Sequence, residues 1–140
     1  MRPVPRVGAH SIGLLFVHLV WATRSRQCVI VHSLDEPLRR FLMAKARELD
    51  ATLLAFGAAA DHVHLLAQIP PELSAAALAG RLKGASSHEF RRPLAVGWQV
   101  GYSVESVDTN SLETTLHYVN GQRERHRTRD AIEAWELQAN

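Results

Sequence analysis

The sequence contains very little cysteine. Cys28 is the one cysteine among 140 residues, so an intrachain disulfide and a cysteine-rich zinc site are both excluded. A chain without disulfides suits a reducing compartment, and we therefore expect a cytoplasmic protein. The length predicts one domain with a single hydrophobic core. We take residues 1–140 as that domain and expect residues 1–11 to form a flexible N-terminal extension.

Long hydrophobic runs are also scarce. The longest candidate extends from Ile12 to Ala22 and is interrupted by His18. It lacks a small-residue cleavage site and is followed by basic residues, so its pattern is not that of a signal peptide. It is also shorter than the roughly 20 residues that a bilayer-spanning helix needs. We interpret it as a buried strand and expect no membrane association.

A large excess of one charge is missing as well. Lys and Arg number 16 and Asp and Glu 14, which gives a formal net charge of +2. This balance is compatible with a nucleic-acid partner but does not indicate one, because a local basic patch matters more than the sum.

Hydrophobic periodicity predicts four strands and four helices. Ser74 has the residue type and position of a helix N-cap. The predicted strands cover residues 13–23, 52–58, 62–69 and 100–107, and the predicted helices cover residues 34–50, 75–91, 111–125 and 130–137. The order β-α-β-β-α-β-α-α predicts an α+β fold, a ferredoxin-like antiparallel sheet with helices on one face. We expect the first and third strands to lie side by side at its centre.

Two histidines fall within the third predicted strand. His62 and His64 are separated by one residue, so both imidazoles project from the same face of the sheet. Two imidazoles in this arrangement can chelate one divalent metal ion. The alternative is that they fill a half-exposed sheet face without binding a metal.

Tyr118 and Gln122 lie four residues apart in the third predicted helix and therefore share a helical face. A tyrosine, with a free pKa of about 10, needs help to ionise before it attacks a phosphate, and a metal can supply that help. Tyr102 is the other tyrosine. The alternative for Tyr118 is a packing role, and Gly121 indicates either a close approach or local flexibility.

Basic and polar side chains gather on the second predicted helix and after the third. Phosphate binding needs such donors spread along a surface, whereas a solvated helix face has the same composition. The DNA-binding candidates are Arg81, Lys83, Ser86, Ser87, Arg123 and Arg125, with His88, His126, Arg127 and Arg129 nearby in the sequence.

Several short motifs occur in a characteristic order. They are Asp61-His62-Val63-His64-Leu65-Leu66, Leu82-Lys83-Gly84-x-Ser86-Ser87, Trp98-x-x-Gly101-Tyr102 and Tyr118-Val119-x-x-Gln122, preceded by His18-Leu19-Val20-Trp21-Ala22-Thr23. Over roughly residues 14–127 the chain resembles the small single-tyrosine HUH transposases of bacterial insertion sequences and their REP-associated relatives. Gly121 departs from that pattern, in which a polar residue precedes the glutamine, and residues 1–11 have no counterpart in it.

The resemblance implies roles for four of the motif residues. His62 and His64 would be metal ligands, Gln122 would be the third protein ligand, and Tyr118 would attack the scissile phosphate of single-stranded DNA. The products would be a 5′-phosphotyrosine and a free 3′-hydroxyl, and another 3′-hydroxyl could reverse the step and join strands.

The resemblance also implies partners: single-stranded or hairpin DNA, Mg²⁺ or Mn²⁺, and a second copy of the chain, in a homodimer where one subunit's tyrosine helix can complete the other's site. No small-molecule cofactor is expected. Two alternatives stay open at this point. One is a domesticated or decayed relative that binds nucleic acid without cutting it, and the other is a metal hydrolase of small phosphoesters, in which Tyr118 would have no function.

Overall fold

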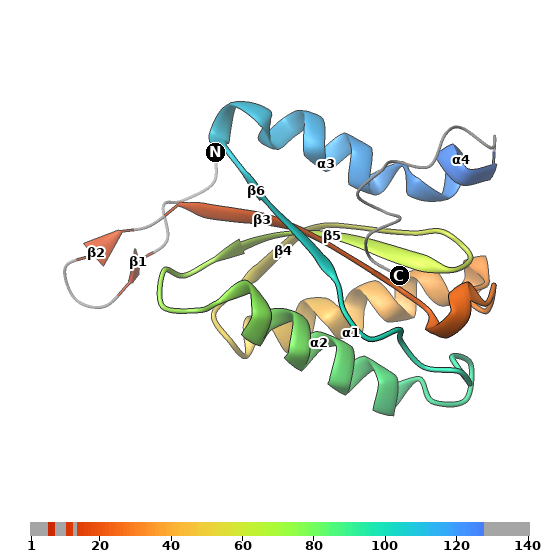
Figure 1. Ribbon diagram of the computed structural model, residues 1–140. Coiled ribbons are helices and arrows are strands. Elements are labelled where there is room, and N and C mark those ends of the chain that lie inside the picture. Colours follow the sequence, from red (N-terminus) through yellow and green to blue (C-terminus); the bar gives the residue numbers. More distant parts are fainter. Residues whose placement is uncertain (1–5, 8–10, 13, 128–140) are drawn as a thin grey trace.

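The computed structural model describes residues 6–7, 11–12 and 14–127 (Figure 1). Within the predicted N-terminal extension, β1 (Arg6–Val7) pairs antiparallel with β2 (Ser11–Ile12), and the rest of that extension lies outside the described residues. The predicted helix at 130–137 also lies outside them. No helix in the described part of the chain is long and apolar enough to cross a membrane.

A four-stranded antiparallel sheet forms the centre of the molecule. Its strands are β3 (Leu15–Ala22), β4 (Thr52–Ala58), β5 (His62–Ile69) and β6 (Ser103–Val107), in the order β4-β5-β3-β6. The prediction that the first and third strands of the fold are central neighbours is confirmed. β5 is buried along its whole length, as expected of a strand that is covered on both faces.

Two helices cover one face of this sheet, as the sequence predicts for a ferredoxin-like α+β fold (Figure 1). They are α1 (Asp35–Arg47) and α2 (Ala75–Glu89). The Ser74 hydroxyl accepts a hydrogen bond from the Ala77 amide, which confirms the predicted N-cap of α2. The main core lies between these helices and the sheet, where Val63, Leu65, Ala67 and Ile69 of β5 are buried against them.

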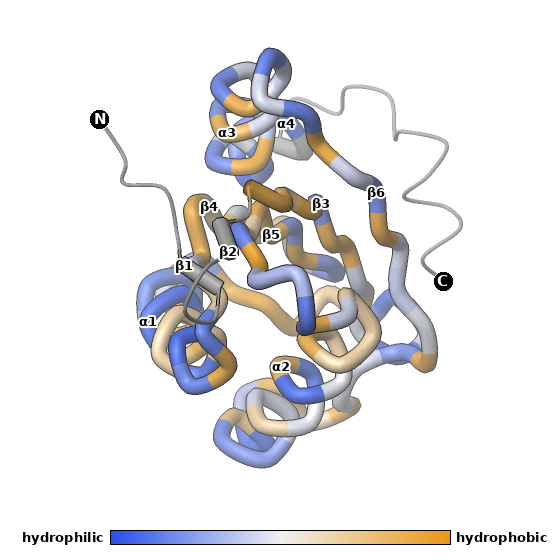
Figure 2. Tube along the Cα trace, turned by 90° about the vertical axis from the view of Figure 1, so that its left-hand side faces the viewer, coloured by the Kyte–Doolittle hydropathy of each residue, from blue (hydrophilic) through white to orange (hydrophobic). Residues whose placement is uncertain are grey.

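The opposite face carries α3 (Leu112–Asn120) and α4 (Gln122–Arg127). Figure 2 shows the largely apolar strands β3, β4 and β5 between α3 on one side and α1 and α2 on the other. A second, smaller core of Ala55, Leu66 and Val119 explains this placement, because it buries the apolar side of α3. The predicted continuous helix at 111–125 is corrected to two helices that are separated at Gly121.

An irregularity in β4 sets which residues face α3. The pairing of β4 with β5 shifts register between Leu53 and Ala55, so Leu54 is an extra residue in the strand. A bulge of this kind re-aims the side chains that follow it. Beyond the bulge, Gly57 pairs with His64, and its α-carbon faces the end of α3, since a β-carbon there would collide with the Val119 main-chain oxygen.

Candidate active site

The two histidines of β5 project toward α3, on the face opposite the main core. Their ring centroids are 5.1 Å apart, as the alternation of strand side chains requires. His62 is 2% exposed and His64 is 0% exposed. The sheet face that they occupy is therefore buried, not half-exposed as the alternative interpretation has it, while a metal-binding role stays a prediction. They are buried polar groups, and such groups need polar partners.

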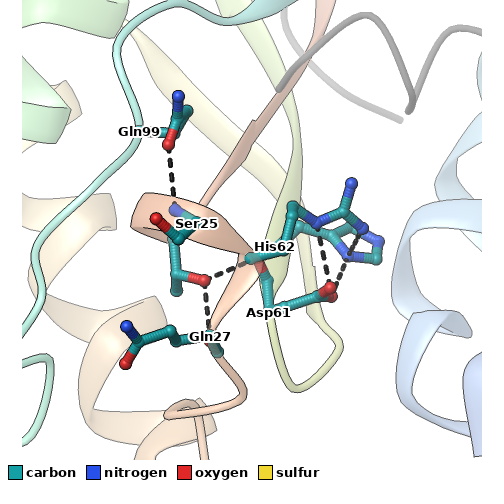
Figure 3. Close-up of polar contacts among 7 residues, drawn as sticks. Ser25, Gln27, Asp61, His62 and Gln99 are labelled. Carbon is teal, nitrogen blue, oxygen red and sulfur yellow. Dashed lines mark hydrogen bonds and ion pairs between the residues drawn. The ribbon is translucent and has the colours of Figure 1, made fainter.

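Asp61 is the partner of the first histidine (Figure 3). One oxygen of its carboxylate lies 2.7 Å from Nδ1 of His62, and the other accepts a hydrogen bond from Nε of Arg26 at 2.9 Å. Burial favours the neutral acid and would raise the pKa of Asp61, but hydrogen bonds from His62 and Arg26, together with the positive charge of Arg26, lower it to about 2. The carboxylate is therefore ionised and acts only as an acceptor.

Arg26 reaches Asp61 from a tight turn, the 3₁₀ helix η1 (Arg24–Arg26). Ser25 and Arg26 have φ values of 57° and 54°, in the left-handed region that non-glycine residues seldom adopt. The Ser25 amide donates to the Gln99 side chain at 3.0 Å and so helps to hold the turn (Figure 3). Strained backbone of this kind persists where surrounding contacts fix it, and it clusters at functional sites.

His18 is the partner of the second histidine. Its Nε2 atom lies 3.0 Å from Nδ1 of His64 in a buried contact between β3 and β5. In both His62 and His64, then, Nδ1 is engaged by a neighbouring side chain. The nitrogen that each ring can present to a metal ion is consequently Nε2. Metal-binding histidines usually form a hydrogen bond through the other ring nitrogen in this way.

The Tyr118 ring packs beside these histidines. Its centroid lies 5.5 Å from that of His64, with the ring planes at 80°, and 5.9 Å from that of His18. The guanidinium carbon of Arg125 stands 4.6 Å from the centre of the tyrosine ring, within cation–π range. The fold therefore brings the predicted nucleophile against a predicted metal ligand, within one chain.

Gln122 begins α4 directly after the break at Gly121, and it is fully buried. Its amide nitrogen donates to the Tyr118 carbonyl at 2.9 Å, which links the two residues across the break. A β-carbon on Gly57 would lie 3.1 Å from that of Gln122, and Gly57 is the ladder partner of His64. Gln122 thus sits over β4, next to the second histidine.

Gly121 is the residue at which α3 ends. A β-carbon there would meet only carbonyl oxygens of α3 itself, at 3.2 Å for His117 and 3.9 Å for Tyr118. These contacts lie within one helix, so neither sequence interpretation of Gly121 is confirmed.

The donor set fits a divalent metal ion of the manganese type. Across residues 6–7, 11–12 and 14–127, no three His, Cys, Asp or Glu side chains converge to hold a metal. Among the described residues, Gln122 places an amide beside the histidine pair and is the candidate for a third protein ligand. Two imidazoles and an amide oxygen suit Mn²⁺ better than Mg²⁺, which prefers oxygen ligands alone. The involvement of a metal stays a prediction.

The predicted DNA-binding residues of α2 do not lie at this site, because α2 covers the other face of the sheet. Ser86 is buried, donates to the Leu82 carbonyl at 2.6 Å and accepts from the Trp98 indole at 2.9 Å. That corrects its expected place on a DNA-facing surface. Lys83 donates to the carbonyls of Gln99 and Gly101 at 2.8 and 2.7 Å, and burial lowers the pKa of its amine.

The remaining candidates differ in their contacts. Arg81 pairs with Glu48 on the surface at 3.0 Å, and Ser87 is half-buried on α2. The Arg123 guanidinium donates hydrogen bonds to both carboxylate oxygens of Asp35 and to the Ile30 carbonyl. These bonds hold α4 against the start of α1. Of the six, Arg125 alone is placed beside Tyr118.

Four residues that build the site carried no role in the sequence interpretation. They are His18, Arg26, Gly57 and Asp61. His18 had a visible signal, as a polar residue inside an apolar strand, and Asp61 directly precedes His62. Arg26 and Gly57 had none, because their importance depends on contacts between distant segments.

The chain is similar to known proteins of one transposase family. The family described as "Transposase IS200 like" matches residues 11–122. The ISDra2 transposase TnpA of Deinococcus radiodurans is 25% identical over 117 residues, covering 77% of this chain and 84% of that protein. The IS200 transposase of Salmonella typhimurium is 26% identical over 114 residues, covering 75% of each.

Solved structures show the same fold. A candidate transposase from Deinococcus radiodurans R1 superposes with a TM-score of 0.64 at 27% identity, covering 85% of this chain and 98% of its own. A REP-associated tyrosine transposase bound to a REP hairpin gives a TM-score of 0.63 at 16% identity, covering 90% and 74%, which is a likeness of fold alone. Because the family match spans most of the sequence, this chain belongs to the IS200-like transposase family.

Proposed function

We propose that this transposase cuts and rejoins single-stranded DNA through a covalent bond between Tyr118 and a 5′-phosphate. The observation that carries the proposal is the packing of the Tyr118 ring against His64, with centroids 5.5 Å apart. The ring is partly buried against the small core of Ala55, Leu66 and Val119, and on this core it lies beside a buried pair of histidines. A nucleophile needs to lie beside the groups that bind the phosphate it attacks.

The proposed reaction conserves the phosphodiester. The phenolic oxygen of Tyr118 attacks the phosphorus and loses its proton to solvent. The bond between phosphorus and the 3′-oxygen breaks, and that oxygen leaves as a hydroxyl after taking up a proton. The DNA strand that retains its 5′-phosphate stays on the enzyme, and the 3′-hydroxyl of another strand can attack the same phosphorus and release Tyr118.

His62, His64 and Gln122 are the residues that would hold the divalent ion. When bound, the ion would withdraw charge from the phosphate and so help a weak nucleophile with a free pKa of about 10. The protein contributes the orientation of these side chains, through Asp61 for His62, through His18 for His64, and through the Tyr118 carbonyl for Gln122.

The DNA partner is proposed to be single-stranded or hairpin DNA. One relative of the same fold is described as bound to a REP hairpin. In this chain Arg125 lies over the Tyr118 ring, where its guanidinium could pair with a phosphate next to the attacked one. A homodimer also stays a proposal. Tyr118 lies against His64 of the same chain, which favours a site built by each subunit over a site shared between two.

The polarity of the covalent product tests this proposal. Single-stranded DNA labelled at its 3′ end should give a labelled, denaturation-resistant protein adduct. The same DNA labelled at its 5′ end should give a shorter free strand that a polymerase can extend, because its 3′-hydroxyl is free. An adduct that carries the 5′ label would contradict the proposed step, as would cleavage without any adduct.

A further inference from the structure

His18 is a buried histidine that the proposed reaction leaves without a part. It comes from β3, is 5% exposed and lies on the same face of the sheet as the histidine pair. Its ring contacts the proposed metal ligand His64 through a hydrogen bond, and its centroid lies 5.9 Å from that of the Tyr118 ring. His18 therefore lies next to both the proposed metal ligand His64 and the proposed nucleophile Tyr118.

The hydrogen bond between the two histidines restricts where their protons lie. A neutral imidazole has one N–H donor and one bare nitrogen acceptor. Since Nε2 of His18 faces Nδ1 of His64, one of these atoms carries a proton and the other does not. A metal ion on Nε2 of His64 requires that nitrogen to be bare, which leaves the proton on Nδ1, and His18 must then accept it.

We propose that His18 is a positioning residue, whose Nε2 accepts the Nδ1 proton of His64 and thereby holds His64 in the tautomer and rotamer that present Nε2 to a metal. The proposal rests on the proposed metal-binding function of His64. It assigns to His18 the part that Asp61 plays for His62. The two partners differ, however, because an ionised carboxylate can only accept, whereas an imidazole can accept or donate.

Because its partner can also donate, the orientation of His64 should be more easily disturbed than that of His62. Removing an outer partner of this kind typically weakens metal affinity about 10–100-fold. A replacement that keeps an acceptor near the position of Nε2 should preserve most of the affinity. One that keeps the ring but removes the acceptor should not.

Two substitutions separate the hydrogen bond from simple packing. His18→Gln places a side-chain oxygen near the position of Nε2, and His18→Phe keeps a ring of similar size with no acceptor. We expect Mn²⁺ titrations of the DNA-free protein, followed by electron paramagnetic resonance, to show a loss of about 10–100-fold for His18→Phe and a much smaller loss for His18→Gln. His32→Gln is the matched control, because the His32 side chain is 83% exposed and its loss should not alter Mn²⁺ affinity.

The wild-type protein alone gives a second readout. Nitrogen-15 correlation spectra of the imidazole rings, recorded without metal or DNA, should show His64 protonated at Nδ1. His18→Phe should shift that proton toward Nε2. This measurement needs no activity and remains informative if the phenylalanine variant folds poorly.

Several results would overturn the inference. They are a wild-type His64 protonated at Nε2, equal Mn²⁺ affinity in wild type and His18→Phe, or equal losses in the Gln and Phe variants, which would make His18 a packing residue. A wild-type protein that binds no Mn²⁺ but shows the expected tautomer would instead count against the proposed function, while the hydrogen bond assigned to His18 would stand.

Discussion

Gly57 faces the Val119 main-chain oxygen so closely that no β-carbon fits between them. Gly57 belongs to β4 and pairs with His64, whereas Val119 follows the proposed nucleophile, Tyr118. The missing side chain thus lets the end of α3 rest on the strand next to the histidine pair. The position of Tyr118 depends on this contact.

Gly57→Ala should accordingly move Tyr118, on α3, away from the histidine pair of β5. The new methyl group would push against backbone, which cannot rotate away, so α3 must lift from the sheet. We expect a destabilisation of about 1–3 kcal/mol, as for other overpacked positions, and a loss of cleavage larger than partial unfolding explains. Thermal unfolding and a cleavage assay measure the two effects.

Gly84→Ala is the matched control for that substitution. A β-carbon at Gly84, on α2, would meet nothing within 4 Å. Alanine is better than glycine inside a helix by about 1 kcal/mol, so this variant should be at least as stable as wild type and equally active. If Gly57→Ala behaved in the same way, Gly57 would not determine the placement of α3.

Removing either histidine of β5 should abolish metal binding. A single imidazole with Gln122 cannot hold a divalent ion, so His62→Ala and His64→Ala should each lose Mn²⁺ affinity and cleavage. A chelator should reproduce the loss in wild type, and added Mn²⁺ should restore wild type only. His88→Ala, on the exposed end of α2, should change neither property. Full wild-type cleavage in the presence of chelator would refute a metal role.

Arg123 should matter more for stability than Arg81, although each pairs with an acid. The Arg123 and Asp35 side chains are 29% and 24% exposed, and the hydrogen bonds from Arg123 to Asp35 and Ile30 hold α4 in place. We expect Arg123→Ala to cost about 1–2 kcal/mol, in the range of charged hydrogen bonds with partial screening.

The Arg81–Glu48 pair provides the comparison. Its side chains are 49% and 50% exposed, so Arg81→Ala should destabilise the protein less than Arg123→Ala does, because solvent screens surface ion pairs. Chemical denaturation of both variants gives the two free energies of unfolding. Equal losses in the free energy of unfolding would show that the hydrogen bonds of Arg123 do not anchor α4.

A mixing experiment tests whether each chain builds its own site. Tyr118 lies against His64 of the same chain, and this geometry predicts that Tyr118→Phe and His64→Ala subunits, each inactive alone, stay inactive when mixed. The homodimer with shared sites that the resemblance implies predicts recovery, because one site of a mixed dimer would keep both groups. Two different affinity tags, recovered together, would verify that subunits exchange.

The fold was largely predictable because its strands and helices have clear periods. The apolar residues of β3 and β5 indicated central strands, and Ser74 marked the start of α2. The side on which α3 lies was not predictable, because Leu112, Leu116 and Val119 form an apolar stripe that could cover either face. The small second core decides it.

The site was predictable in its main residues but not in their supports. His62 and His64 share a face by strand alternation alone, and Tyr118 lies near Gln122 by helical spacing. The bulge at Leu54, which turns Gly57 toward α3, leaves no mark in the sequence. The prediction that Ser86 contacts DNA was wrong. A hydroxyl on a basic helix is typical of a phosphate contact, but the Ser86 hydroxyl is buried and accepts a hydrogen bond from Trp98.

The most direct test of the proposed function compares Tyr118→Phe with Tyr102→Phe on labelled single-stranded hairpin DNA. Tyr102 is half-buried and packs against the main core, so its phenylalanine variant should still form the adduct. Tyr118→Phe loses only the attacking oxygen, so it should bind the DNA nearly as well as wild type and form no denaturation-resistant adduct. An adduct that persists in Tyr118→Phe, or that disappears only in Tyr102→Phe, would contradict the assignment of Tyr118 as the nucleophile.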